Sequence, residues 1–143
     1  MAAGMGTDMV SVHRPTGEYM MISPAVINIL GYNPEELLGT DPYLLMHPDD
    51  KERVWEESHS FVLDNKIKTI SESRFRKKDG KYMWLRCETI PQVDTRGQVI
   101  SLLCISQDIT EIIMLREQLQ HKEQLVKEHE QMKDYIHAFT PVS

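Results

Sequence analysis

Apolar residues fall into several short segments along the chain, followed by one long amphipathic segment. Five short segments are β-branched or alternate between apolar and polar residues, a pattern typical of strands. Turn residues such as Pro15-Thr16-Gly17 and Lys78-Asp79-Gly80 separate the strands of the expected hairpins. The expected strands are 8–13, 18–22, 67–77, 81–92 and 99–108. The segment from Ile112 to Phe139 has no Pro or Gly and predicts a long helix.

Three helices are expected between the second and third strands. Each begins with a proline, whose missing N–H costs nothing at the first helical position. The starts are Ser23-Pro24, Asn33-Pro34 and His47-Pro48, and the third helix runs to about Leu63. Ser23 and Asn33 are candidate caps, with Glu36 completing a capping box with Asn33. Sequential antiparallel strands with helices gathered in the middle predict an α+β fold with the helices on one face of the sheet.

Composition narrows the class of protein. The chain has 143 residues, 41% hydrophobic, and a net charge of −6, which argues against nucleic-acid binding. No segment approaches the ~20 apolar residues of a membrane span, and the N-terminal residues lack the charged and apolar regions expected of a signal peptide. Cys87 and Cys104 lie in apolar strand patterns without metal-site spacing, so reduced thiols in a cytoplasmic domain are expected.

Several segments together resemble the PAS sensory family, in the form common in bacterial signalling proteins. They are Ser23-Pro24-Ala25, Leu30 to Gly39 (LGYNPEELLG), His47-Pro48-Asp49-Asp50, Arg76 to Gly80 with Trp84, and Asp108-Ile109-Thr110. The resemblance covers about residues 8–111. It implies a five-stranded antiparallel sheet of order 2-1-5-4-3 that cups the helices, and a domain that senses and relays rather than catalyses. The expected organisation is a disordered or tag-like 1–7, a PAS domain over 8–110, a signalling helix over 111–139, and the start of a linker to an output domain at 140–143.

The cup could hold a small ligand. Strand alternation places Met83, Leu85 and Cys87 on one face of their strand, and the resemblance assigns that face, with both thiols, to the inside. The candidate pocket residues are Leu30, Leu37, Met46, Val54, Phe75, Met83, Leu85, Cys87, Leu102 and Cys104. The alternative is that these side chains simply fill the core. Because no Arg or His pair is expected inside, any ligand is predicted to be apolar or weakly polar.

No cofactor is expected. Light sensors of the family carry a reactive Cys on a middle helix, and here the middle helices have none. Haem-binding members carry a His on the longer middle helix, and the matching position here falls at or near Trp55. His59 lies about one turn later and is interpreted as an ordinary helix-surface or boundary His. His47 is interpreted as a loop residue beside a cap. Neither a metal nor a catalytic constellation is predicted, and His137 lacks the residues that follow a kinase phosphoacceptor.

The outer face of the sheet and the long helix predict a homodimer. Trp84, Leu103 and Ile105 form an apolar strip among charges on the outer face, which a second subunit or the helix is expected to cover. In the helix, Leu115 and Leu119 continue a coiled-coil seam from Ile112. A second seam of different phase follows, formed by Leu125, His129, Met132, Ile136 and Phe139.

The strand-to-helix junction is the expected route of a signal. Asp108 and Thr110 are candidate caps, and Glu111 has capping-box spacing from Asp108. The favoured function is a cytoplasmic sensory and dimerisation module of a bacterial signal-transduction protein, such as a two-component histidine kinase or a cyclase. The alternative is a non-sensing dimerisation or interaction scaffold with a filled core.

Overall fold

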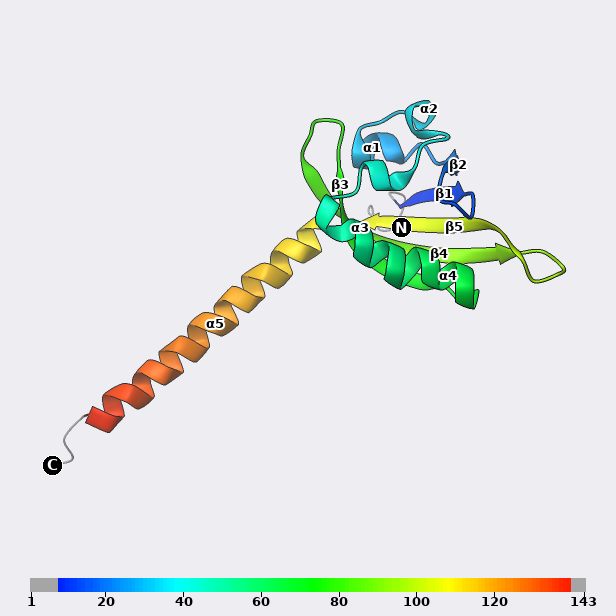
Figure 1. The fold of residues 1–143 in the computed structure, drawn as a ribbon. Coiled ribbons are helices and arrows are strands. Elements are labelled where there is room, and N and C mark those ends of the chain that lie inside the picture. The colour runs from blue at the N-terminus through cyan, green and yellow to red at the C-terminus, as the bar shows by residue number, and fades with distance from the viewer. Residues whose placement is uncertain (1–7, 140–143) are drawn as a thin grey trace, which may run out of the picture. The chain divides into compact units, whose positions relative to one another are not determined.

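The computed structural model describes residues 8–139, so the predictions for 1–7 and 140–143 lie outside the described residues. The chain forms two units, one ending at Ile109 and one beginning at Thr110. The first unit contains a sheet with helices, and the second is a single helix (Figure 1).

A five-stranded antiparallel sheet forms the first unit, in the predicted order β2-β1-β5-β4-β3. Its strands are β1 (Met9–His13), β2 (Tyr19–Ile22), β3 (Thr69–Arg76), β4 (Tyr82–Val93) and β5 (Val99–Asp108). Every predicted strand lies within two residues of these bounds. The two hairpins of the second half turn at Gly80 and Gly97, both at positive φ (89° and 78°), a conformation that glycine adopts without steric cost.

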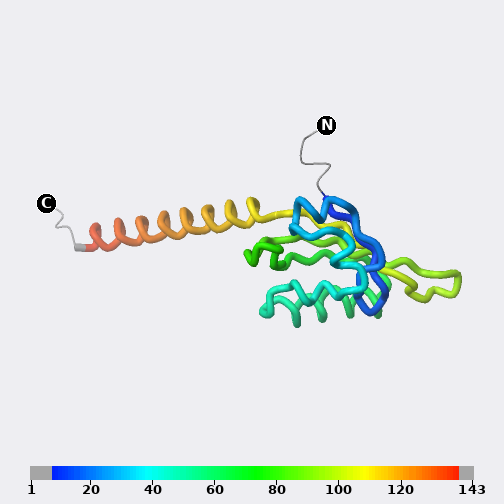
Figure 2. Tube along the Cα trace, turned by 90° about the horizontal axis from the view of Figure 1, so that it is seen from above, coloured from blue at the N-terminus to red at the C-terminus, as the bar shows by residue number. Residues whose placement is uncertain are grey.

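The helices between β2 and β3 lie on one face of the sheet, as predicted (Figure 2). They are α1 (Val26–Leu30), α2 (Pro34–Leu37), the short 3₁₀ turn η2 (Pro42–Leu44), α3 (Pro48–Val54), the π-helical turn η3 (Trp55–His59) and α4 (Ser60–Asn65). The last three are consecutive, so the predicted third helix contains a π-turn and ends two residues later than expected.

The helix starts differ in detail from the predicted caps. Glu36 accepts the Asn33 backbone N–H at 2.8 Å, the return bond of a capping box. The Ser23 prediction was wrong: its hydroxyl accepts the Val10 N–H at 3.0 Å, and α1 begins only at Val26. His47 is itself the cap of α3, because its Nδ1 accepts the Asp49 N–H at 3.1 Å.

One buried ion pair ties α3 to β3. Asp50 is 4% exposed and accepts three hydrogen bonds from Arg74: one from the backbone N–H and two from the guanidinium, at 2.8 to 3.1 Å. Burial alone would raise the pKa of Asp50, but the Arg74 hydrogen bonds and the charges of Arg74 and Arg53 together lower it. The carboxylate therefore fixes the helices onto the edge strand in its charged form.

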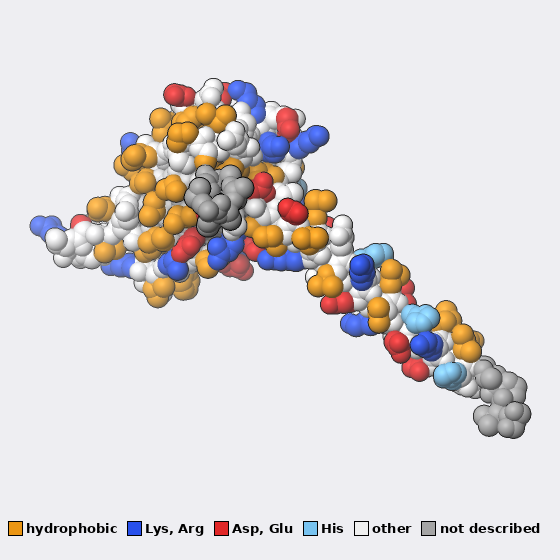
Figure 3. All heavy atoms as spheres, turned by 180° about the vertical axis from the view of Figure 1, so that it is seen from behind, with side chains coloured by type: hydrophobic (Ala, Val, Ile, Leu, Met, Phe, Trp, Pro, Cys, Tyr) orange, Lys and Arg blue, Asp and Glu red, His pale blue; other side chains and the backbone are white. Residues whose placement is uncertain are grey.

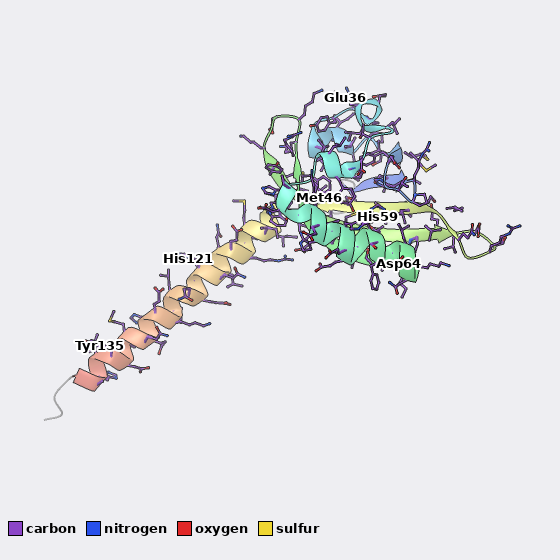
Figure 4. All side chains as sticks on the ribbon, in the orientation of Figure 1. Glu36, Met46, His59, Asp64, His121 and Tyr135 are labelled. Atoms are coloured by element: carbon purple, nitrogen blue, oxygen red, sulfur yellow. The ribbon has the colours of Figure 1, made fainter. Side chains whose placement is uncertain are left out.

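The second unit is α5 (Thr110–Phe139), a single helix of 30 residues. It begins two residues earlier than the periodicity predicted. Apolar side chains are exposed along its length, including those of the predicted first seam, Ile112, Leu115 and Leu119. Figure 4 labels His121 and Tyr135 on this helix. Because the spacing of eight residues turns successive side chains by about 80°, His121, His129 and His137 do not share one face of α5.

Candidate functional site

A cavity of about 80 Å³ lies inside the first unit, between the sheet and its helices. Figure 4 labels Met46 and His59, two of its lining residues, where the helical side faces the sheet. At ~30 Å³ per water molecule, the volume admits two or three water-sized groups. The sheet contributes lining residues from β1, β2, β3, β4 and β5, and η2, α3 and η3 contribute from the helical side.

Seven of the ten candidate pocket residues line this cavity. They are Met46, Val54, Phe75, Leu85, Cys87, Leu102 and Cys104. The other three, Leu30, Leu37 and Met83, belong to the buried hydrophobic cluster and are not among the lining residues. The predicted inner face of β4 and β5 is confirmed, because Met83, Leu85 and Leu102 are buried and both thiols face the cavity.

The lining is more polar than the sequence predicted. It includes the hydroxyls of Ser11, Tyr19, Tyr43, Ser58, Ser71, Ser73, Thr89 and Ser106, and the imidazoles of His13 and His59. The expectation that no His pair lies inside was therefore wrong. The residue pattern gave no signal for His13, because Val10 and Val12 are the more apolar alternate set of β1, yet Met9, Ser11 and His13 are the residues that face inward. His59 is buried by the π-turn, which no residue pattern announced.

His13 is held neutral by its surroundings. Its Nδ1 lies 2.7 Å from the Gly17 carbonyl and its Nε2 lies 2.8 Å from the Ser11 hydroxyl. The carbonyl can only accept, so Nδ1 carries the proton and Nε2 accepts from Ser11. Burial lowers the pKa of His13, outweighing the opposing effect of the Gly17 carbonyl. A neutral imidazole therefore stands at one end of the cavity.

His59 makes the matching arrangement from the helical side. Its Nε2 donates to the Pro15 carbonyl at 2.7 Å, and its Nδ1 accepts from the Tyr43 hydroxyl at 3.0 Å. The two imidazoles thus bind carbonyls of the same β1–β2 turn, at Pro15 and Gly17. Gly17 has a φ of +119°, and a Cβ there would lie 3.3 Å from His59 Cε1, so this turn packs closely against the imidazole.

The two thiols are neighbours on adjacent strands. Thr89 pairs with Cys104, and Cys87 pairs with Ser106, which places the cysteines on a diagonal of the β4–β5 ladder. The Thr89 hydroxyl lies 3.6 Å from each sulfur. Hydrogen bonds from Cys104, Ser106 and Thr89 lower the pKa of Cys87 despite its burial, whereas the interaction with Cys87 and burial raise the pKa of Cys104. The first thiolate of the pair is therefore at Cys87.

β5 connects the cavity to the junction along the chain. Leu102, Cys104 and Ser106 line the cavity, Asp108 ends the strand, and α5 begins at Thr110. Between them Ile109 is 2% exposed, and its N–H donates to the Trp84 carbonyl at 3.0 Å. The sequence drew attention to the polar residues Asp108, Thr110 and Glu111, and missed this apolar anchor.

The opposite face of the sheet carries an apolar strip wider than predicted. Trp84, Leu103 and Ile105 are half-buried, and Arg74 lies over the Trp84 ring at 5.2 Å. The ladder places Val10 and Ile105 side by side, and Leu103 between Val12 and Ile90. Figure 3 shows hydrophobic side chains gathered among charged ones on this side of the domain.

The described residues contain neither a candidate metal site nor a candidate membrane-spanning helix. Within 8–139, no three His, Cys, Asp or Glu side chains are arranged to hold a metal ion. Among the helices of the same range, none has the length and apolarity needed to span a bilayer.

Comparison with known proteins identifies the domain. The PAS fold family matches residues 19–106, more than half of the chain. The fold of a cupped sheet over an internal cavity is thus that of a sensory and regulatory module rather than a catalytic one. The chain belongs to the PAS family.

Its relatives are diverse. The chain is 37% identical over 83 residues to the Basic helix-loop-helix ARNT-like protein 2 of Gallus gallus, a match covering 57% of this chain and 13% of that protein. It is 30% identical over 112 residues to a diguanylate cyclase of Vibrio cholerae, covering 77% and 35%. The crystal structure of a PAS domain from Colwellia psychrerythraea superposes with a TM-score of 0.67 at 28% identity, covering 73% of this chain and 88% of that one. The chain thus spans about an eighth of the length of the first curated relative.

Proposed function

We propose that this PAS domain senses a small uncharged molecule in its cavity and relays occupancy through β5 to α5. The observation that carries the proposal is the cavity itself, lined by alternate residues of the strand that runs directly into the junction. A filled core would leave no space for a ligand, so the cavity favours sensing over the scaffold alternative.

The lining defines the class of ligand. No Lys, Arg, Asp or Glu lines the cavity, and burial lowers the pKa of the lining His13, so a charged ligand would meet no carboxylate, ammonium or guanidinium as a counter-charge. The Ser, Thr and Tyr hydroxyls offer donors and acceptors beside apolar walls. A ligand of a few non-hydrogen atoms with one or two polar groups fits this lining, and it belongs to the apolar or weakly polar class predicted from the sequence.

The relay would pass through the junction. A ligand that displaces Cys104 or Ser106 moves a strand whose next buried residue is Ile109, held by the Trp84 carbonyl. We expect Asp108→Ala to leave the fold intact and uncouple the output of the full-length protein. The match to a diguanylate cyclase supports a cyclase as one class of output, with a histidine kinase as another.

Dimerisation would complete the module. We propose a homodimer through the sheet strip of Trp84, Leu103 and Ile105 and through the α5 seam that includes Leu115 and Leu119. Exposed apolar side chains along α5 support the second contact, because an isolated helix of this kind needs packing to persist. Light scattering on Trp84→Glu tests the sheet contact, with Leu44→Glu, at an exposed apolar residue of η2 on the helical side, as the control. A dimer that is unchanged by Trp84→Glu would contradict the sheet contact.

Native mass spectrometry of the purified chain tests the sensing proposal. We expect a retained small molecule, or a thermal shift on adding uncharged polar compounds of cavity size. In Ser73→Leu, which fills the cavity from β3, the shift should disappear, whereas in Ser101→Leu, which faces away from the cavity, it should persist. An unliganded protein that no such compound stabilises would favour the scaffold.

A further inference from the structure

The paired thiols in the cavity have a chemistry that ligand binding does not use. Cys87 and Cys104 both line the cavity, and the Thr89 hydroxyl lies 3.6 Å from each sulfur. As whole residues, Cys87 is half-buried and Cys104 is buried, and both line the cavity. Core cysteines that only fill space need neither a shared cavity nor neighbouring hydroxyls.

We propose that Cys87 and Cys104 form a dithiol site at which a small uncharged hydroperoxide is reduced and an intrachain disulfide is formed. Cys87 is the attacking sulfur and Cys104 the resolving one. The cavity admits a molecule the size of hydrogen peroxide, and its lining offers hydroxyl donors and no charged side chain.

The groups around Cys87 suit the attacking role. Hydrogen bonds from Cys104, Ser106 and Thr89 stabilise its thiolate and lower its pKa. Cys104 keeps its proton, because the pKa of its thiol is raised beside a Cys87 thiolate. The interaction between the two thiols therefore favours Cys87 as the attacking thiol and Cys104 as the resolving one.

The chemistry balances without any other reactant. The Cys87 thiolate attacks the terminal peroxide oxygen, the O–O bond breaks, and the leaving alkoxide or hydroxide takes a proton to become an alcohol or water. Cys87 is then a sulfenic acid. The Cys104 sulfur attacks the Cys87 sulfur, the S–O bond breaks, and the hydroxide leaves as water with the Cys104 proton. Overall two thiols lose two electrons and two protons to one hydroperoxide.

A disulfide between Cys87 and Cys104 would change the pairing of β4 and β5 near Thr89 and Ser106. Diagonal residues of neighbouring strands lie about 7–8 Å apart at Cα, whereas disulfides span about 4.4–6.8 Å. Because β4 and β5 already lie at hydrogen-bonding distance, bond closure should slide the two strands along one another near Thr89 and Ser106.

Peptide mapping of the full chain tests the site. The reduced protein is treated with hydrogen peroxide, and we expect a Cys87–Cys104 disulfide within one chain. In Cys104→Ser the reaction should stop at a Cys87 sulfenic acid, trapped by dimedone. In Cys87→Ser the remaining thiol should be lost more slowly than Cys87 is in Cys104→Ser, because burial still raises the pKa of the Cys104 thiol after the contribution of Cys87 is gone.

Two measurements on the unmodified sequence keep the test independent of variant folding. The rate of thiol loss should rise with pH over a range below the ordinary thiol pKa of about 8.5. Cumene hydroperoxide, too bulky for the cavity, should react more slowly than hydrogen peroxide. Equal rates for the two single variants, equal rates for the two peroxides, or a product that is only intermolecular would overturn the proposal.

This inference goes beyond the proposed function. If the disulfide forms and α5 is unaffected, the dithiol site stands and the relay fails. If ligands bind and no intrachain disulfide forms, the relay stands and the dithiol site fails.

Discussion

The clearest quantitative expectation concerns Ile109, the buried residue between β5 and α5. Its side chain is 2% exposed. Ile109→Ala removes three carbon atoms, which at ~0.8 kcal/mol each gives ~2.4 kcal/mol of lost burial. A residual cavity adds to this, so we expect the free energy of unfolding of the PAS unit to fall by about 3 to 4 kcal/mol.

Urea denaturation followed by tryptophan fluorescence measures this loss. Trp55 and Trp84 are the two tryptophans of the chain, and both belong to the unit that ends at Ile109, so the signal follows that unit and not α5. Ile112→Ala is the matched control: its side chain is 42% exposed, and we expect a change below about 0.5 kcal/mol. Equal destabilisation by the two substitutions would refute Ile109 as the anchor of the junction.

Three further predictions concern groups that hold the site. Asp50→Asn should lower the free energy of unfolding by about 3 kcal/mol in chemical denaturation, because Arg74 loses its buried carboxylate. The stability that comes from the lowered Asp50 pKa is fully present above the unfolded value of ~3.9 and should be lost below it, as pH falls through the lower pKa of the folded state. The pKa of His13 is lowered in the folded state, so the stability that its neutral form contributes is present above ~6.5 and is lost at lower pH. The free energy of unfolding of His13→Gln should therefore fall less than that of the wild type between pH 7 and pH 5.5. Identical losses would contradict a buried neutral imidazole. Gly17→Ala should lower the free energy of unfolding by about 1 to 2 kcal/mol in thermal denaturation, because the turn holds φ at +119° and the new Cβ would lie beside His59. Gly39→Ala is the control: it also has a positive φ but open space around its Cβ, so it reports the backbone cost alone.

The sequence predicted the sheet well because its signals are local. Alternation in Met83 to Cys87 and the turn at Asp79-Gly80 specify strand and hairpin together, the resemblance assigned the inward face, and the structure places those residues as expected. The resemblance supplied the strand order, which alternation cannot give.

The polar part of the site depended on long-range geometry. His59 binds the carbonyl of Pro15, 44 residues earlier in the chain, and reaches it through a π-turn that leaves no distinctive residue pattern. Asp50 lies in the first turn of α3, but its main partner is Arg74 on β3, 24 residues later in the chain. Ile109 was overlooked because its neighbours are polar and a single apolar residue has no periodicity.

The central claim is that the state of the cavity reaches the junction through β5. Hydrogen–deuterium exchange at the Ile109 amide, which donates to the Trp84 carbonyl, tests it most directly in two variants of the same strand. Ser106→Val adds bulk inside the cavity, and Ser101→Val makes the same change on the opposite face of β5. We predict that Ser106→Val speeds exchange at Ile109 about fivefold, equivalent to about 1 kcal/mol of local stability, and that Ser101→Val leaves it unchanged. Unchanged exchange in Ser106→Val, or the same acceleration in both variants, would contradict the claim.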